Sequence, residues 1–116
     1  MFQERRSAPR IRTYHPVRIF RPGSVKPIET LTKDLGSGGF RCISSDVFPV
    51  STELNVELVL STGEELLSAR GRTAWFQMIP KCDQFDIGIT FVDLSPHHRQ
   101  HLLTYLERSS HQPIAA

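Results

Sequence analysis

Three arginines near the start of the chain and a glycine-rich stretch further on are the residues best suited to hold an anionic ligand. Arg5, Arg6 and Arg10 form the first group, and residues 34 to 39, Asp-Leu-Gly-Ser-Gly-Gly, form the second. An arginine side chain carries a planar, permanent charge that pairs with phosphate or with the O6/N7 edge of guanine, and it stacks on aromatic bases. Glycines let backbone amides approach the same ligand closely. Together the two groups indicate a nucleotide-binding site.

The charge of the chain is concentrated at its N-terminal end. The first 21 residues contain six arginines and a single acidic residue, Glu4, so this segment carries +5. Because the whole chain carries +2, the remainder carries −3. No lysine occurs in the segment although lysine is the more strongly hydrated cation, which favours planar recognition over simple solvation. We therefore expect this segment to seek anions.

Length and composition limit the possible classes of protein. A chain of 116 residues is sufficient for one domain with a modest core. Its 39% hydrophobic and 22% charged residues are typical of a globular protein and exclude a disordered or fibrous one. No apolar run approaches the roughly 20 residues that span a bilayer, and no hydrophobic stretch of a signal peptide follows the arginines. The sequence therefore predicts a cytoplasmic protein without a membrane span.

Alternation of apolar and polar residues predicts strands along most of the chain. The clearest case is the run in which Leu54, Val56 and Leu58 alternate with more polar residues, which is typical of a strand with one buried face. Gly71 lies inside the longest expected strand and indicates a bulge where that strand bends. Six short strands with turn residues between them favour a mainly β fold, a six-stranded antiparallel barrel. The expected strands include residues 17 to 19, 27 to 34, 40 to 42, 54 to 60, 65 to 78 and 85 to 91.

The period changes near the C-terminus. Ser95 can cap a helix and Pro96 suits its first position. Leucines then recur at helical spacing up to about residue 108, which predicts a helix that plugs or flanks the barrel. These leucines are Leu102, Leu103 and Leu106.

These patterns divide the chain into three parts. Residues 1 to 12 are expected to be a flexible, arginine-rich ligand-binding arm, and residues 13 to 108 the barrel with its helix. Residues 109 to 116 show no pattern and are expected to be a disordered tail. Cys42 and Cys82 have no motif spacing, and both are interpreted as small buried hydrophobic residues.

The motifs and their order resemble the PilZ domain family over nearly the whole chain. The resemblance includes the N-terminal arginines, the D-x-x-x-x-G turn at 34 to 39, Gly-Arg-Thr-Ala-Trp at 71 to 75 and Ile-Gly-Ile-Thr-Phe-Val-Asp-Leu at 87 to 94. The terminal helix matches as well. PilZ domains are six-stranded barrels with a C-terminal helix that bind the bacterial second messenger cyclic di-GMP through RxxxR and [D/N]xSxxG motifs.

The resemblance implies a set of ligand-binding residues. Arg6 and Arg10 match RxxxR, while Asp34 and Gly39 match the ends of the second motif. Gly36 stands where the family has serine, and a serine follows one place later. Loss of one neutral hydrogen bond costs about 0.5 to 1.5 kcal/mol, so binding is expected to survive. The implied ligand-binding residues are Arg5, Arg6, Arg10, Asp34, Gly36, Ser37 and Gly39.

The ligand's chemistry agrees with these residue types. Cyclic di-GMP carries two phosphates and two guanines, for which arginines supply cations and donors and Asp34 supplies an acceptor for guanine NH groups. In the family, the residue just before RxxxR influences whether one ligand or a stacked pair is held. That residue is Arg5 here, a third stacking cation, which favours a stacked pair.

The resemblance further implies a receptor that performs no chemistry and needs no cofactor beyond its ligand. Ligand would fold the arm onto the barrel and so change the surface offered to an unidentified effector protein. The controlled process would be motility, exopolysaccharide production or another surface behaviour.

Enzyme signatures are missing from the sequence. The glycine turn lacks the GxSxG spacing of a nucleophile elbow and the GxxxxGK[ST] phosphate signature. His97 and His101 are four residues apart on the expected helix, but no HExxH glutamate lies between them, so no metal site is expected.

Two alternative functions remain open. One is a PilZ-like protein-interaction module that has lost its ligand, although such a module would be expected to lack the arginines. The other is direct nucleic-acid binding by a small barrel. Phe85 and Phe91 share a face with Ile87 and Ile89 and are therefore interpreted as core, which disfavours a base-stacking surface. Trp75 is likewise interpreted as a barrel residue.

Overall fold

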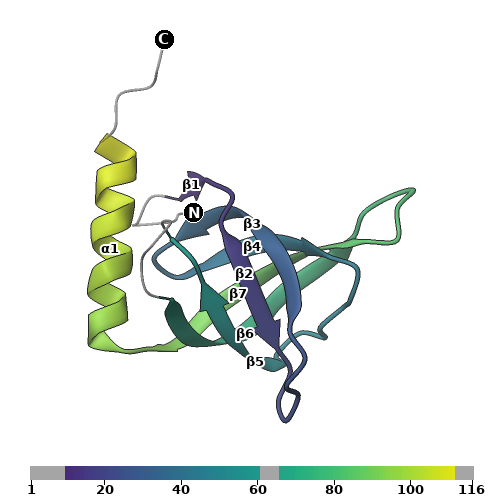
Figure 1. The fold of residues 1–116 in the computed structure, drawn as a ribbon. Helices are drawn as coiled ribbons and strands as arrows, with labels where there is room; N and C mark the ends of the chain where they lie inside the picture. Colours follow the sequence, from purple (N-terminus) through teal and green to yellow (C-terminus); the bar gives the residue numbers. More distant parts are fainter. Residues whose placement is uncertain (1–9, 61–65, 112–116) are drawn as a thin grey trace, which may run out of the picture.

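The computed structural model describes residues 10–60 and 66–111, which form seven strands followed by one helix (Figure 1). The strands are β1 (Ile11–Arg12), β2 (Pro16–Phe20), β3 (Ile28–Gly36), β4 (Gly39–Ser44), β5 (Glu53–Leu58), β6 (Leu67–Met78) and β7 (Phe85–Leu94). The helix is α1 (Pro96–His111).

Six of these strands close into an antiparallel barrel. Neighbouring strands follow the order β3, β2, β5, β6, β7, β4, and pairing of β4 with β3 closes the ring. The short β1 pairs with the end of β3, opposite Asp34 and Leu35, while β2 pairs with residues 28 to 31 of the same strand. β1 therefore continues the line of β2 and adds no seventh position. The predicted mainly β fold, a six-stranded antiparallel barrel with a C-terminal helix, is confirmed.

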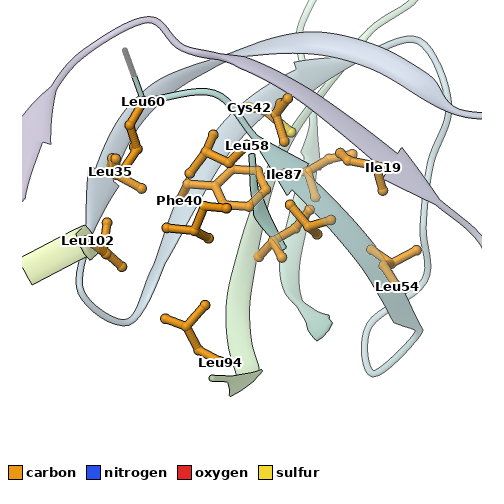
Figure 2. Packing of buried hydrophobic residues seen from close by; sticks show 14 of the residues in the cluster. Ile19, Leu35, Phe40, Cys42, Leu54, Leu58, Leu60, Ile87, Leu94 and Leu102 are labelled. Carbon is orange, nitrogen blue, oxygen red and sulfur yellow. The ribbon is translucent and has the colours of Figure 1, made fainter. Parts of the chain in front are cut away.

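Inward-facing apolar side chains fill the barrel (Figure 2). In β5 the buried residues Leu54, Val56 and Leu58 alternate with more exposed polar ones, as their period of two predicts. Phe40 and Ile87 reach the same cluster from β4 and β7. Because the strands share this one core, their positions relative to one another are fixed, and so are those of their outward-facing residues.

The helix packs against the barrel through two leucines. Leu102 and Leu106 are buried in the core cluster, whereas Leu103 is exposed. The predicted N-cap is confirmed, because the backbone N–H of His98 donates to Ser95 Oγ at 3.2 Å. α1 ends at His111, three residues beyond the expected end, so the segment predicted to be a disordered tail begins with helix. Residues 112–116 of that segment lie outside the described residues.

The pairing of β6 with β7 is irregular at Gly71, but the extra residue lies in β7 and not, as predicted, in the long strand β6. Arg70 lies opposite Asp93, whereas the next residue, Gly71, lies opposite Phe91, so the register with β7 shifts at the glycine. A Cβ atom at Gly71 would lie 2.8 Å from Ile89 Cγ2, closer than real contacts allow. Glycine thus lets β6 lie close to Ile89 of β7 at this level.

Three expectations need correction. The boundary of the arm at residue 12 is too late, because Ile11–Arg12 already form β1; residues 1–9 lie outside the described residues. The second expected strand continues to Gly36, inside the glycine-rich stretch. Cys42 is buried as expected, but Cys82 is exposed in the β6–β7 connection.

Candidate functional site

A straight row of residues crosses four strands on the outer face of the barrel. Asp34 of β3 lies opposite Arg41 of β4, and Arg41 lies opposite Gly88 of β7. Gly88 in turn lies opposite Trp75 of β6. Residues directly opposite each other share a face of a sheet. Because Leu35, the chain neighbour of Asp34, points into the core, the row faces outward.

The carboxylate of Asp34 binds two arginines through different oxygens. Nε of Arg10 donates to Oδ1 at 3.2 Å, and Nη2 of Arg10 contacts the same oxygen. Nε of Arg41 donates to Oδ2 at 3.0 Å. Side-chain exposure of 30% for Arg10 and 24% for Asp34 leaves both partly accessible from solvent. Arg10 and Asp34, one residue from each of the two sequence motifs, therefore meet in space.

A second carboxylate completes the network. Nη1 of Arg41 donates to Oδ2 of Asp86 at 2.9 Å. Asp86 belongs to β7, two positions before Gly88, and so lies on the same outer face. Positive and negative groups thus alternate across the surface in the order Arg10, Asp34, Arg41, Asp86.

The arginines keep Asp34 ionised. Burial raises the pKa of the Asp34 carboxyl, but the hydrogen bonds and charges of Arg10 and Arg41 outweigh burial and lower the pKa below its usual value. The hydrogen bond to Asp34 in turn raises the pKa of Arg41, against a smaller opposing effect of burial. Asp34 is accordingly an acceptor without a proton at neutral pH.

The glycine-rich stretch forms the tight connection between β3 and β4. Gly36 lies opposite Gly39, so only Ser37 and Gly38 make the reversal. The turn is held against β7, because the backbone N–H of Phe91 donates to the carbonyl of Gly38 at 2.8 Å. A Cβ atom at Gly39 would lie 2.0 Å from the carbonyl oxygen of Ile89, which only glycine avoids.

The structure also describes Gly36, which stands at the motif position where the family has serine. Gly36 is buried as the last residue of β3, whereas Ser37, one place later, is half-buried in the turn. Asp34 and the turn belong to one hairpin, so this part of the site is a continuous piece of chain.

Trp75 closes the far end of the row. Its indole lies against Gly88, where an added Cβ would be 2.2 Å from Nε1. The side chain is 42% exposed and faces outward, so Trp75 is a residue of the barrel wall and does not belong to its core. As the single tryptophan of the chain, it is a spectroscopic reporter next to the network.

The predicted site residues are thus partly assembled. Arg10 and Asp34 are in contact, and Gly36, Ser37 and Gly39 belong to the same hairpin as Asp34. Two further predicted residues, Arg5 and Arg6, lie outside the described residues.

Sequence reasoning missed Arg41 and Asp86. Both stand at polar positions of alternating strands, which places them outside the core, but 45 residues separate them in the chain. The strand register that brings them together is not readable from such alternation.

Other kinds of site find no support in the described part of the chain. Within residues 10–60 and 66–111, no group of three or more His, Cys, Asp or Glu residues is arranged to hold a metal ion. None of the described helical residues forms a segment long and apolar enough to cross a membrane.

Comparison with known proteins identifies relatives of the whole fold. The family model for the PilZ domain matches residues 4–108. A comparison with curated proteins gives no match.

Several solved structures are similar to this chain. The inhibitor of motility of Bacillus subtilis, MotI, has a TM-score of 0.78 at 20% identity over 93% of this chain. MrkH of K. pneumonia, in complex with c-di-GMP, has 0.76 at 17% identity over 93%. This chain spans 52% and 53% of those two proteins. The PilZ domain of YcgR from Escherichia coli, with c-di-GMP, has 0.68 at 14% identity, over 92% of this chain and 95% of that one. At these identities the likeness establishes the fold.

Proposed function

This chain belongs to the PilZ domain family, and on that premise we propose that it is a receptor for cyclic di-GMP. The ligand binds on the outer face of the barrel, between the arginines of the N-terminal segment and the β3–β4 hairpin. Two of the similar structures contain this ligand, and its transfer to the present chain depends on the motif residues.

The ion pair between Arg10 and Asp34 is the observation that supports the proposal best. These residues come from the two motifs, are 24 positions apart and meet on the surface. A contact between a guanidinium and a carboxylate at this place puts a phosphate-binding group beside a group that accepts guanine NH donors.

We assign roles by chemistry. Arg6 and Arg10 bind phosphate and the O6/N7 edge of guanine, and Arg5 adds a stacking cation. Asp34 accepts hydrogen bonds from guanine. Gly36 and Gly39 permit close approach of the backbone, while the Ser37 hydroxyl, half-buried in the turn, is the nearest replacement in sequence for the motif serine.

The output of such a receptor is a change of surface and involves no reaction. Ligand neutralises the arginines and draws the N-terminal segment onto the barrel. An effector protein then binds or is released. We propose that the receptor acts in the cytoplasm and controls motility or exopolysaccharide production.

Calorimetric titration with cyclic di-GMP tests the proposal. The wild-type chain should bind with guanine selectivity, so GMP and cyclic di-AMP should bind far more weakly. The double variant Arg6→Ala/Arg10→Ala should lose at least about 30-fold in affinity, since each bidentate arginine contributes roughly 1 to 3 kcal/mol. Quenching or enhancement of Trp75 fluorescence gives an independent readout.

A matched control removes an arginine of the same region outside the site. Arg18 lies on β2 and pairs with Glu57 at 2.9 Å, so Arg18→Ala should bind as the wild type does. No heat from the wild type at high ligand concentration would reject the receptor and favour the interaction-module function. Equal loss in both variants, with binding of a single-stranded oligonucleotide, would favour the nucleic-acid function.

A further inference from the structure

The two oxygens of the Asp34 carboxylate have partners of different kinds. Oδ1 binds Arg10, which precedes β1 at the beginning of the described residues. Oδ2 binds Arg41, which lies inside β4 and is paired on both sides, with β3 and with β7. One partner is thus attached to a terminal segment and the other to the barrel wall.

Arg41 is fixed by two ion pairs at once. Its Nε binds Asp34 at 3.0 Å and its Nη1 binds Asp86 at 2.9 Å, so the guanidinium joins three adjacent strands. The three side chains are 32%, 24% and 23% exposed, so they are only partly hydrated. Moving Arg41 would break both pairs and take the arginine away from Asp86, whereas moving Arg10 breaks one pair and leaves Asp34 bound to Arg41. Moving Arg41 is therefore more costly than moving Arg10.

The two oxygens of Asp86 differ in their surroundings. Oδ1 is buried and has no hydrogen-bond partner among the described residues, whereas Oδ2 binds Arg41. A buried acceptor without a donor costs free energy, and the ion pair with Arg41 offsets that cost.

We propose that Arg41, held in place by Asp86, is a positioning residue. It fixes the Asp34 carboxylate in the orientation that binds guanine, while Arg10 leaves Asp34 and binds the ligand. This inference rests on the proposed function. When the ligand arrives, Arg10 leaves Oδ1 for a phosphate, and Oδ1 accepts the guanine N1–H. Each carboxylate oxygen has two lone-pair positions, so Oδ2 keeps Arg41 and also accepts from the guanine N2 amine.

Fixing the carboxylate has a consequence for specificity. A carboxylate held in one orientation meets both guanine donors, whereas a freely rotating one loses the advantage of the second donor. Hypoxanthine keeps O6, N7 and N1–H but lacks the N2 amine. The ratio of affinities for cyclic di-GMP and cyclic di-IMP therefore measures the orientation of Asp34, and phosphate binding cancels from that ratio.

The test titrates both cyclic dinucleotides into the full chain and five variants of it. Arg41→Gln should reduce cyclic di-GMP affinity about 10-fold or more and leave cyclic di-IMP affinity nearly unchanged, so that the ratio approaches 1. Asp86→Asn should move the ratio in the same direction, and the double variant should be no worse than Arg41→Gln because the two act as one unit. Arg41→Lys should restore the ratio only in part, since ammonium lacks the two-sided geometry. Arg10→Ala should weaken both ligands by the same factor.

Arg70→Gln is the matched control. Arg70 also lies between two carboxylates on neighbouring strands, Asp93 at 3.4 Å and Glu53 at 4.0 Å, but away from Asp34. The ratio of affinities for cyclic di-GMP and cyclic di-IMP in Arg70→Gln should equal that of the wild type. Thermal melting of every variant identifies loss of folding, and a variant that melts near the assay temperature is titrated at a lower one.

The outcomes separate this inference from the proposed function. If the wild type binds and Arg41→Gln keeps the wild-type ratio, Arg41 does not position Asp34. If Arg41→Gln weakens both ligands equally, Arg41 acts on phosphate and the inference fails as well. A wild type that does not bind cyclic di-GMP overturns the proposed function, and the inference falls with it.

Discussion

At the scale of single residues, we propose that Arg5 and Arg6 supply cations in addition to the network of Asp34. The described part of this network pairs Arg10 and Arg41 with Asp34 and Asp86, so its formal charge balances. A ligand with two phosphates needs cations that are not already paired. We therefore expect the remaining arginines of the N-terminal cluster to determine affinity and stoichiometry.

Stoichiometry is the first prediction at this scale. With Arg5 as a third stacking cation, calorimetric titration of the wild type should saturate at two ligands per chain, as a stacked pair. Arg5→Ala should saturate at one, because the second ligand loses its platform. Arg18→Ala serves again as the arginine control. Saturation of the wild type at one ligand per chain would reject the stacked pair.

The two cysteines should differ sharply in reactivity. Burial, with a smaller contribution from the charge of Asp86, raises the pKa of the Cys42 thiol to about 12, while Cys82 is exposed. Because the thiolate is the reactive form, a thiol reagent such as Ellman's should titrate one group in the native chain and two after denaturation. Cys82→Ser should remove the fast group and Cys42→Ser should keep it. Two fast groups in the native wild type would contradict the buried position of Cys42.

At the scale of elements, the β3–β4 hairpin lies close to β7 because Gly39 has no side chain. Gly39→Ala would force a Cβ to within 2.0 Å of the Ile89 carbonyl oxygen, so the hairpin must move away from β7. We expect a loss of about 3 kcal/mol in the free energy of unfolding, measured by urea denaturation. Gly38→Ala is the matched control, since an added Cβ there meets nothing within 4 Å. Equal stability of the two variants would contradict this account.

The attachment of α1 should depend on pH through His15. The His15 Nε2 atom lies 2.7 Å from the Tyr105 hydroxyl of α1 and 2.8 Å from Thr13 Oγ1. Burial lowers the pKa of His15, and a weaker backbone hydrogen bond to Val59 opposes this shift. The unfolded chain therefore binds more protons, and stability is fully present above pH 6.5 and falls as the pH drops below that value.

Thermal melting between pH 7.5 and pH 5 checks this dependence. The melting temperature of the wild type should fall toward pH 5, and His15→Gln should flatten the slope. The control His97→Gln changes an exposed histidine of α1 and should keep the wild-type slope of melting temperature against pH. This pH range stays above 3.8, the ordinary pKa of an aspartate carboxyl, so the lowered pKa of Asp34 contributes little to the change in melting temperature. A wild-type slope retained by His15→Gln would assign the effect to other groups.

The elements also show what sequence can and cannot predict. Alternation predicted β5 and the buried face of β7, because that signal is local to each strand. Gly71 marked the position of a register shift, but the strand that carries the extra residue there is β7, which only the pairing defines. β1 was missed because two residues carry no period, and only pairing with β3 defines that strand. The site followed the same division. Asp34 and the turn were readable from a motif, whereas Arg41 and Asp86 required the register of three strands.

At the scale of the whole molecule, the barrel separates α1 from the β6–β7 connection, which projects from the opposite side (Figure 1). The site residues Arg10 and Asp34 lie beside β1, on the side of the barrel nearer the helix. Thr13 and His15 follow Arg10 closely in the chain, and the His15 imidazole contacts both the Thr13 hydroxyl and the Tyr105 hydroxyl of α1. A ligand that displaces Arg10 from Asp34 therefore affects the same short segment that contacts the helix through His15.

This connection leads to the last prediction, which concerns hydrogen exchange with and without cyclic di-GMP. Ligand should slow amide exchange in residues 1 to 12, mainly in the part that precedes β1, because phosphate contacts hold the arginines against the barrel. The effect should extend to the segment around His15 and to α1, since one hydrogen-bonded cluster joins them. The variant Arg6→Ala/Arg10→Ala should show no change at the same ligand concentration. Equal protection of residues 1 to 12 in both states of the wild type would reject the switch while leaving ligand binding itself untouched, because an already ordered segment can bind without folding.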